Sequence, residues 1–109
     1  MTQWDTSQYA FPHGTHPCII ISRTARCNNP VFETVNVLAC QSQKATRQAG
    51  ELEELLDVED GMDWLTIVRC DFIWVAQKSE LTRRRGSVSA QRRRAVGAKV
   101  IRAIGLWLE

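Results

Sequence analysis

Long hydrophobic runs are absent from this chain of 109 residues. No segment approaches the roughly 20 consecutive apolar residues that a membrane-spanning helix needs, so we expect no membrane association. The N-terminal sequence MTQWDTSQYAF also lacks the basic start and the apolar stretch of a secretory signal. The sequence therefore predicts a cytoplasmic protein.

Closely spaced cysteine pairs are absent as well. The four cysteines are far apart in the sequence and form no Cys-x-x-Cys motif: Cys18, Cys27, Cys40 and Cys70. This spacing argues against a closed zinc site and favours reduced, mostly buried thiols. His13 and His16 form a His-x-x-His pair, but no third ligand is evident. We expect neither a metal nor another cofactor.

Internal repeats and low-complexity segments are absent too. The composition, with 44% hydrophobic and 24% charged residues, is typical of an ordinary globular protein. A chain of this length is large enough for one core, although association with a second subunit would help to stabilise it. We therefore expect a single domain over residues 1–109.

The net charge of +2 hides a strong segregation of charge. Residues 50–64, here called the acidic segment, contain seven acidic residues and no basic one: Glu51, Glu53, Glu54, Asp57, Glu59, Asp60 and Asp63. Residues 83–109, the basic segment, contain eight basic residues and one acidic residue, Glu109: Arg83, Arg84, Arg85, Arg92, Arg93, Arg94, Lys99 and Arg102. Clustered basic residues attract a phosphate backbone or an acidic partner. Equally, they are typical of the solvent-exposed face of a terminal helix.

The first half of the chain predicts short strands separated by loops. Alternating or continuous apolar residues favour strands at residues 4–11, 18–22 and 32–40. Residues 12–17 predict a loop, because two prolines and a glycine cannot all lie in a paired strand. Asn28-Asn29-Pro30 predicts a turn at the end of a second loop, residues 23–30, and the polar residues 41–50 predict a third loop.

Residues 51–57 give conflicting signals. Their leucines are spaced as in a helix, but we expect a strand because pairing overrides local propensity in short segments. The apolar, β-branched residues 65–75 predict a long strand with Arg69 and Asp71 on one face. The arginines of residues 83–86 predict a basic turn closed by glycine.

A C-terminal helix is expected at residues 90–104, with Ser89 as its N-cap and Gly105 at its end. Its apolar stripe consists of Val96, Gly97, Val100, Ile101 and Ile104. Three basic residues lie on the opposite face: Arg92, Lys99 and Arg102. Arg93 instead projects onto the apolar stripe, which predicts that it packs against the protein. Several short strands with one late helix indicate a mainly β fold, a small closed or half-closed barrel.

An ordered set of residues resembles the PemK/MazF family of toxin endoribonucleases. The set comprises Asp60-Gly61, the strand Val68-Arg69-Cys70-Asp71-Phe72-Ile73, Lys78, Leu81, Gly86-Ser87-Val88-Ser89 and Ile104-Gly105-Leu106. The resemblance covers nearly the whole chain and is more specific in its second half. It implies an SH3-like barrel with a C-terminal α-helix, which works as a homodimer and is neutralised by a small cognate antitoxin.

The resemblance also implies a chemistry. Family members cleave single-stranded RNA without a metal, using the ribose 2′-hydroxyl as the attacking group. The family places an arginine before the proline of the second strand and a threonine at the end of the third. Here His16 and Cys40 stand at those positions, with Ser42 two residues further on. An imidazole suits proton transfer, and His13 in the same loop allows two histidines to divide the acid and base roles.

These residues also have structural interpretations. His16 could simply be a loop residue before a strand, and Cys40 a small buried residue at the end of another strand. Several residues of the flanking loops could contact RNA or could simply be solvated: Arg23, Arg26, Gln41, Lys44 and Arg47. Trp4, Phe11 and Trp64 could stack on bases, although core positions are the commoner role of aromatic residues.

Two other functions remain open. The apolar end Leu106-Trp107-Leu108 needs burial against the barrel or another subunit. It also suggests an alternative function, that of a CcdB-like protein that binds DNA gyrase. Trp74 and Trp107 suit core or subunit-interface positions. The loss of the family's arginine and threonine suggests a second alternative, a catalytically inactive barrel that binds nucleic acid or protein.

Overall fold

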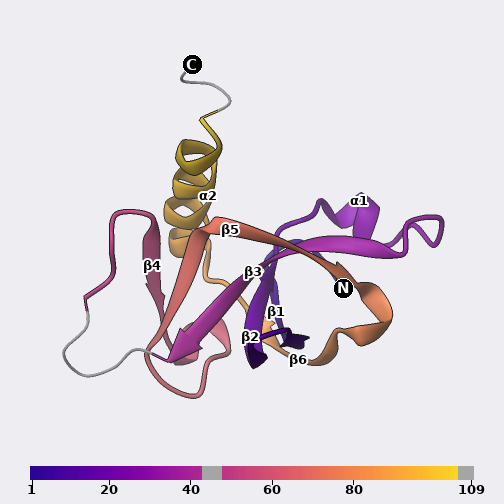
Figure 1. The fold of residues 1–109 in the computed structure, drawn as a ribbon, viewed down its shortest axis with the longest axis horizontal. Coiled ribbons are helices and arrows are strands. Elements are labelled where there is room, and N and C mark those ends of the chain that lie inside the picture. The colour runs from indigo at the N-terminus through magenta and orange to yellow at the C-terminus, as the bar shows by residue number, and fades with distance from the viewer. Residues whose placement is uncertain (43–47, 106–109) are drawn as a thin grey trace.

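The computed structural model describes residues 1–42 and 48–105. The described residues form a single curled sheet of antiparallel strands in the order β4-β5-β3-β2-β1-β6 (Figure 1). The strands are β1 (Asp5–Phe11), β2 (Gly14–Ile20), β3 (Thr34–Ser42), β4 (Glu53–Leu56), β5 (Thr66–Gln77) and β6 (Thr82–Ser87). The helices are α1 (Thr24–Cys27), η1 (Val58–Asp60), η2 (Lys78–Glu80) and α2 (Ala90–Ile104). The mainly β fold with a C-terminal helix is confirmed.

The pairing of β3 with β5 is interrupted at one point, and this break is important for the site. Leu38 pairs with Ile73, but Cys40 pairs with Val68. Ala39 alone therefore lies opposite residues 69–72 of β5. At this point β5 pairs with the other neighbouring strand, since Arg69 lies opposite Glu53 of β4. Strands β3 and β5 keep their pairing on either side of this break.

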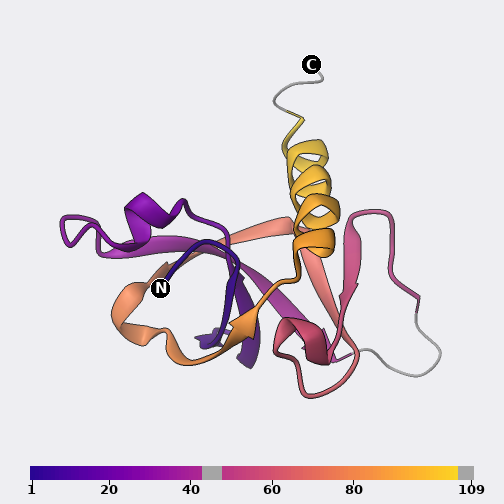
Figure 2. The ribbon, with the colours of Figure 1, turned by 180° about the vertical axis from the view of Figure 1, so that it is seen from behind.

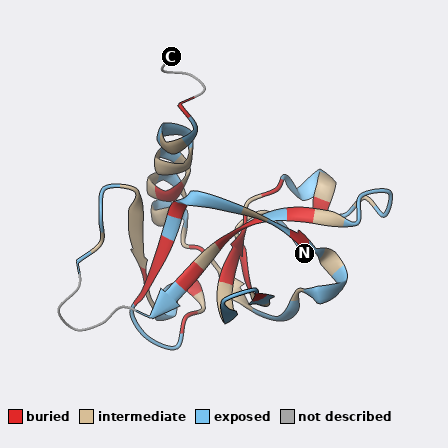
Figure 3. Cartoon of the chain, viewed as in Figure 1, coloured by how far each residue is buried: buried red, intermediate tan, exposed pale blue. Residues whose placement is uncertain are grey.

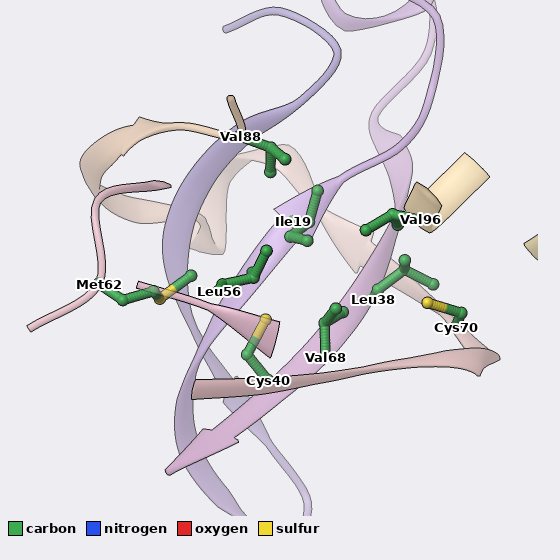
Figure 4. Close-up of a cluster of buried hydrophobic side chains, with 9 residues drawn as sticks. All are labelled: Ile19, Leu38, Cys40, Leu56, Met62, Val68, Cys70, Val88 and Val96. Carbon is green, nitrogen blue, oxygen red and sulfur yellow. The ribbon is translucent and has the colours of Figure 1, made fainter. Parts of the chain in front are cut away.

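The core consists of two clusters of buried apolar side chains. The first core cluster lies between the sheet and the start of α2 (Figure 4) and contains Ile19, Leu38, Cys40, Leu56, Met62, Val68, Cys70, Val88 and Val96. The second contains Phe11, Cys18, Ile20, Cys27, Val35, Val37 and Ala76. Buried residues follow the central strands, whereas much of the second half of β5 is exposed (Figure 3). All four cysteines are free and buried, as expected.

Helix α2 has the predicted bounds, but its N-terminus is stabilised differently from the prediction. Ser89 is the N-cap residue, but within the described residues its side chain makes no capping hydrogen bond. Instead, its backbone N–H donates to Oδ1 of the fully buried Asp60 at 2.8 Å. The predicted apolar stripe is buried only at Val96, because the helix extends beyond the sheet and leaves Ile101 and Ile104 exposed. The position of the N-cap is therefore confirmed, whereas the expected side-chain cap is replaced by the bond to Asp60.

Two basic residues of α2 contact the acidic segment of the same chain. Arg92 forms ion pairs with both Asp57 and Asp60, and Lys99 lies 3.1 Å from Glu54, so neither residue simply faces solvent. The cause is the position of α2 beside β4, which brings the helix against the acidic segment (Figure 2). Arg93 packs against the protein as predicted, donating through Nε to the Val88 carbonyl at 2.7 Å.

Two other expectations were wrong. Pro17 lies inside β2 opposite Gln8, not in a loop. This is possible because β2 pairs with β3 only from Cys18 onward, so the missing proline N–H removes no bond from that ladder. The predicted basic turn at residues 83–86 is part of β6. An edge strand can carry arginines because one side of it remains in solvent, and the turn-like feature is limited to the positive φ of Arg83, 51°.

Residues 51–57 and 23–30 show how tertiary contacts act on local preferences. The expected strand in the first stretch is confirmed as β4, despite its helix-like leucine spacing. The second stretch, expected to be a loop, contains the single turn of α1. Lys78 Nζ holds this turn by donating to the carbonyls of Arg26 at 2.7 Å and Asn29 at 2.9 Å.

Candidate active site

The hairpin between β1 and β2 brings the two histidines of the chain together. The imidazole rings of His13 and His16 are stacked, with centroids 5.1 Å apart and an interplanar angle of 27°. Gly14 makes this arrangement possible, because its φ of +134° is rarely adopted by other residues. A Cβ at this glycine would also lie 3.3 Å from Nε2 of His16. The pair of histidines proposed from the sequence is therefore a spatial pair.

Two adjoining hollows lie on either side of this pair. The first, here called the aromatic hollow, has a volume of about 250 Å³ and is lined by His13, Ala39, Cys40, Gln41, Arg69, Phe72 and Trp74. The second, the histidine hollow, has a volume of about 200 Å³ and is lined by Gln8, Thr15, His16, Pro17, Ser42, Asp63, Trp64, Thr66 and Arg85. Stacked His13 and His16 link the two hollows.

His16 is suited to accept a proton. Partial burial, followed by repulsion from a protonated His13, lowers the pKa of His16 below its usual value. A lower pKa leaves the imidazole neutral at physiological pH, which is the form that acts as a base. The histidine hollow therefore contains a group that can remove a proton from a bound hydroxyl.

Arg85 supplies the positive charge of the histidine hollow. Its side chain is only 6% exposed and is fixed on three sides. Nε donates to the Gly61 carbonyl at 3.0 Å, Nη1 donates to Gln8 Oε1 at 3.0 Å, and Nη2 lies 2.8 Å from Asp63 Oδ2. This bond to Arg85 lowers the pKa of the Asp63 carboxyl. Because a guanidinium has five N–H groups, Arg85 retains donors that could contact a phosphate.

Ser42 also lies in the histidine hollow, where its hydroxyl accepts a hydrogen bond of 2.6 Å from Nε1 of Trp64. This bond fixes the end of β3 against the segment that leads into β5. Trp64 is 60% exposed, so a large aromatic surface remains accessible beside the hollow.

Cys40 occupies a different environment from the other candidate residues. Its side chain is 2% exposed and belongs to the first core cluster (Figure 4). Burial raises the pKa of its thiol well above the usual value, so the thiolate is strongly disfavoured. This position favours the structural interpretation of Cys40, a small buried residue at the end of a strand.

The structure brings some of the predicted RNA-contacting residues to the hollows and not others. Gln41 lines the aromatic hollow. Arg23 and Arg26 lie at α1, near the opposite end of β3 from Ser42 (Figure 1). Arg26 is also occupied there, since its Nε donates to the Thr34 carbonyl at 3.0 Å and its guanidinium lies 4.3 Å from the centroid of the Phe32 ring.

Other predictions concern residues outside the described ranges: Lys44, Arg47, Leu106, Trp107 and Leu108. Of the aromatic candidates inside them, Phe11 is buried in the second core cluster and Trp4 packs against the first. Only Trp64 is exposed beside a hollow. Residues 1–42 and 48–105 contain no group of three or more histidine, cysteine, aspartate or glutamate residues that could hold a metal ion.

Comparisons with known proteins show that the chain is similar in structure to several solved proteins. No family model and no curated protein matches the sequence. The chain superposes over its full length on 99% of an endoribonuclease in complex with its cognate antitoxin from mycobacterial species, with a TM-score of 0.82 and 19% identity. It is similar over 93% of its length to 97% of the Mycobacterium tuberculosis toxin MazF-mt6, with a TM-score of 0.75 and 21% identity.

A MazE-MazF structure from Deinococcus radiodurans is similar over 96% of this chain and 95% of that one, with a TM-score of 0.74 and 15% identity. The chain has the fold of the MazF toxins. The resemblance found in the sequence is thus confirmed for this MazF-like fold. The described part of the fold contains no helix long and apolar enough to cross a membrane.

Two residues of the histidine hollow were missed by sequence reasoning. Arg85 and Asp63 come from segments far from His16 in the sequence, and only the MazF-like fold brings them to it. A signal for Arg85 was present in the arginine triplet at residues 83–85. Read as a strand, the triplet places neighbouring arginines on opposite faces, and the structure shows Arg84 62% exposed and Arg85 6% exposed.

Proposed function

We propose that this chain is the toxin of a type II toxin-antitoxin pair and a metal-independent endoribonuclease that cleaves single-stranded RNA. Two of the similar structures support the pairing, because one contains a cognate antitoxin and another is described as MazE-MazF. The catalytic part of the proposal rests on one observation: His16, whose imidazole has a lowered pKa, lies in the same hollow as the buried Arg85.

These groups suit attack by the ribose 2′-hydroxyl on the neighbouring phosphorus. Neutral His16 takes the hydroxyl proton as the new O–P bond forms. The bond to the 5′-oxygen breaks, and protonated His13 supplies the proton that this leaving oxygen needs. Arg85 stabilises the negative charge that develops on the phosphate oxygens. The products are a 2′,3′-cyclic phosphate and a free 5′-hydroxyl, so atoms and protons balance.

The test is incubation of the purified protein with single-stranded RNA in EDTA. Cleavage should occur, should yield the cyclic phosphate, and should cease when the ribose at the cut site is 2′-deoxyribose. His16→Ala should lower the rate by roughly 100- to 10,000-fold, the usual contribution of a general base. Cleavage by His16→Ala at the normal rate would refute the role of this residue.

Arg85 has a matched control in Arg94, an exposed arginine of α2. Arg85→Gln should abolish most cleavage, because it removes the charge beside the phosphate, whereas Arg94→Gln should cleave normally. Equal losses in both variants would show that general attraction of RNA, not the histidine hollow, accounts for the effect of Arg85.

The same assays separate the alternatives. Intact RNA together with inhibition of DNA gyrase would establish a CcdB-like activity. Intact RNA without growth arrest on expression would indicate a catalytically inactive binding barrel.

We also propose that the protein is a homodimer. Exposed apolar side chains on α2, Ile101 at 46% and Ile104 at 53%, support burial against a second subunit. Sedimentation analysis tests this proposal, and a monomer at micromolar concentration would contradict it.

A further inference from the structure

We infer that the aromatic hollow binds a nucleobase of the RNA whose backbone lies in the histidine hollow. This inference rests on the proposed function, since it assumes that single-stranded RNA is the ligand. It adds a recognition site to the proposed chemistry and assigns it to Phe72, Trp74 and Gln41.

The shape of the hollow follows from the break in strand pairing. Ala39 alone lies opposite four residues of β5, and its small side chain lines the hollow at this break. The resulting volume of about 250 Å³ is small for a drug-sized ligand. It is suited to one planar ring system with open access from solvent.

Two partly exposed aromatic rings, those of Phe72 and Trp74, line the hollow. Phe72 and Trp74 are stacked, with centroids 5.2 Å apart and an interplanar angle of 29°. The ring of Phe11 also contacts Trp74 edge-on, with centroids 5.5 Å apart. Phe72 is 46% exposed, so much of its surface is available to a ligand. Successive bases of single-stranded nucleic acids stack on side chains of this kind.

Polar groups at the rim suit the edge of a base. Gln41 lines the hollow, and its side-chain amide offers both a donor and an acceptor. Arg69 lies 5.4 Å from the centroid of the Phe72 ring and pairs with Asp71 at 3.1 Å. Its guanidinium is thus held at the rim, with donors that could reach a base edge or a phosphate.

Continuity with the histidine hollow favours RNA over a second copy of the chain. His13 lines the aromatic hollow and stacks on His16 of the other hollow, so a ligand that extends from one to the other passes the proposed proton-transfer groups. A nucleotide has this form, with a planar base next to a sugar and a phosphate.

The experiment measures binding of RNA oligonucleotides in which one base at a time is removed. The probe spans the mapped cut site and carries 2′-deoxyribose there, so that it is not cleaved; if the wild type cuts nothing, the unmodified oligonucleotide is used. Removal of one particular base should weaken binding by the wild type by roughly 5- to 150-fold. Phe72→Ala should weaken binding of the intact probe comparably and should no longer respond to loss of that base.

Two further variants sharpen this test. Ala39→Leu places a larger side chain in the hollow and should reproduce the effect of Phe72→Ala. Ile73→Ala is the matched control, because this neighbour is also an exposed apolar residue of β5, at 39%, but does not line the hollow. It should bind like the wild type.

The inference is overturned if Phe72→Ala keeps the same sensitivity to the missing base, or if wild-type protein binds none of the probes. A change from dimer to monomer in Phe72→Ala, with RNA binding intact, would assign the face to a subunit contact and would also overturn it. Catalysis is scored separately. Base-dependent binding without cleavage would support the base site and refute the proposed reaction. Cleavage at the normal rate by Phe72→Ala would support the reaction and refute the base site.

Discussion

Replacing Gly61 by alanine should destabilise the protein strongly, because this glycine combines an unusual backbone conformation with very close neighbours. Its φ is +86°, in the left-handed region. A Cβ there would lie 2.8 Å from the backbone carbonyl of Arg85 and 2.8 Å from Thr6 Oγ1. Real Cβ atoms do not approach backbone this closely, so β6 would have to move away from η1.

The size of the effect can be added up from its causes. A left-handed conformation costs a residue other than glycine about 1 to 2 kcal/mol, and overpacking costs about 1 to 3 kcal/mol. The lower entropy of the unfolded alanine chain returns about 0.4 to 1 kcal/mol. We therefore expect Gly61→Ala to lower the free energy of unfolding by about 1 to 5 kcal/mol.

Gly97→Ala provides a control with the same chemical change and the opposite sign. Gly97 lies inside α2, and a Cβ there would meet the Trp4 ring at an ordinary distance of 3.8 Å. Replacing a helical glycine by alanine stabilises a protein by about 0.5 to 1 kcal/mol. Urea denaturation of both variants at one protein concentration measures the two values. A loss below 1 kcal/mol in Gly61→Ala would refute the reasoning.

The remaining predictions concern the site and its support. His13→Asn should lower the cleavage rate and move the acid limb of its pH profile to higher pH, because the pKa of His16 rises when the neighbouring charge is removed; an unmoved acid limb would contradict this coupling. Cys40→Ala should retain cleavage while losing on the order of 1 kcal/mol of stability, and a folded but inactive variant would show that the thiol is needed. Asp60→Asn should lower the free energy of unfolding by about 2 to 4 kcal/mol, because this buried carboxylate pairs with Arg92 and accepts backbone hydrogen bonds; thermal or urea denaturation with a loss under 1 kcal/mol would argue against it.

The second half of the chain was predictable because its signals are local. The helix at residues 90–104 follows from its spacing and from Gly105, whose φ of 71° confirms the expected stop. The long strand β5 follows from its β-branched and aromatic residues. The turn at Asp60-Gly61 likewise follows from the preference of glycine for positive φ.

The site could be predicted only in part, because its geometry depends on pairing between distant segments. His13 and His16 are close in the sequence, and their proximity could be inferred. The aromatic hollow arises from a register break between β3 and β5, which no local pattern records. Arg85 reaches the site because β6 pairs with β1, whereas its arginine-rich sequence favours a turn.

The contact between the acidic segment and α2 has a consequence for the ionic strength at which the proposed RNA ligand would bind. Three cations of the basic segment that are not assigned to phosphate binding already face carboxylates of the acidic segment: Arg92, Lys99 and Arg102. Each phosphate that a protein neutralises on a single strand steepens the dependence of log affinity on log salt by roughly 0.7. Because these cations are internally compensated, the slope should be shallow, and stacking should hold RNA at salt concentrations that release it from a strongly cationic surface.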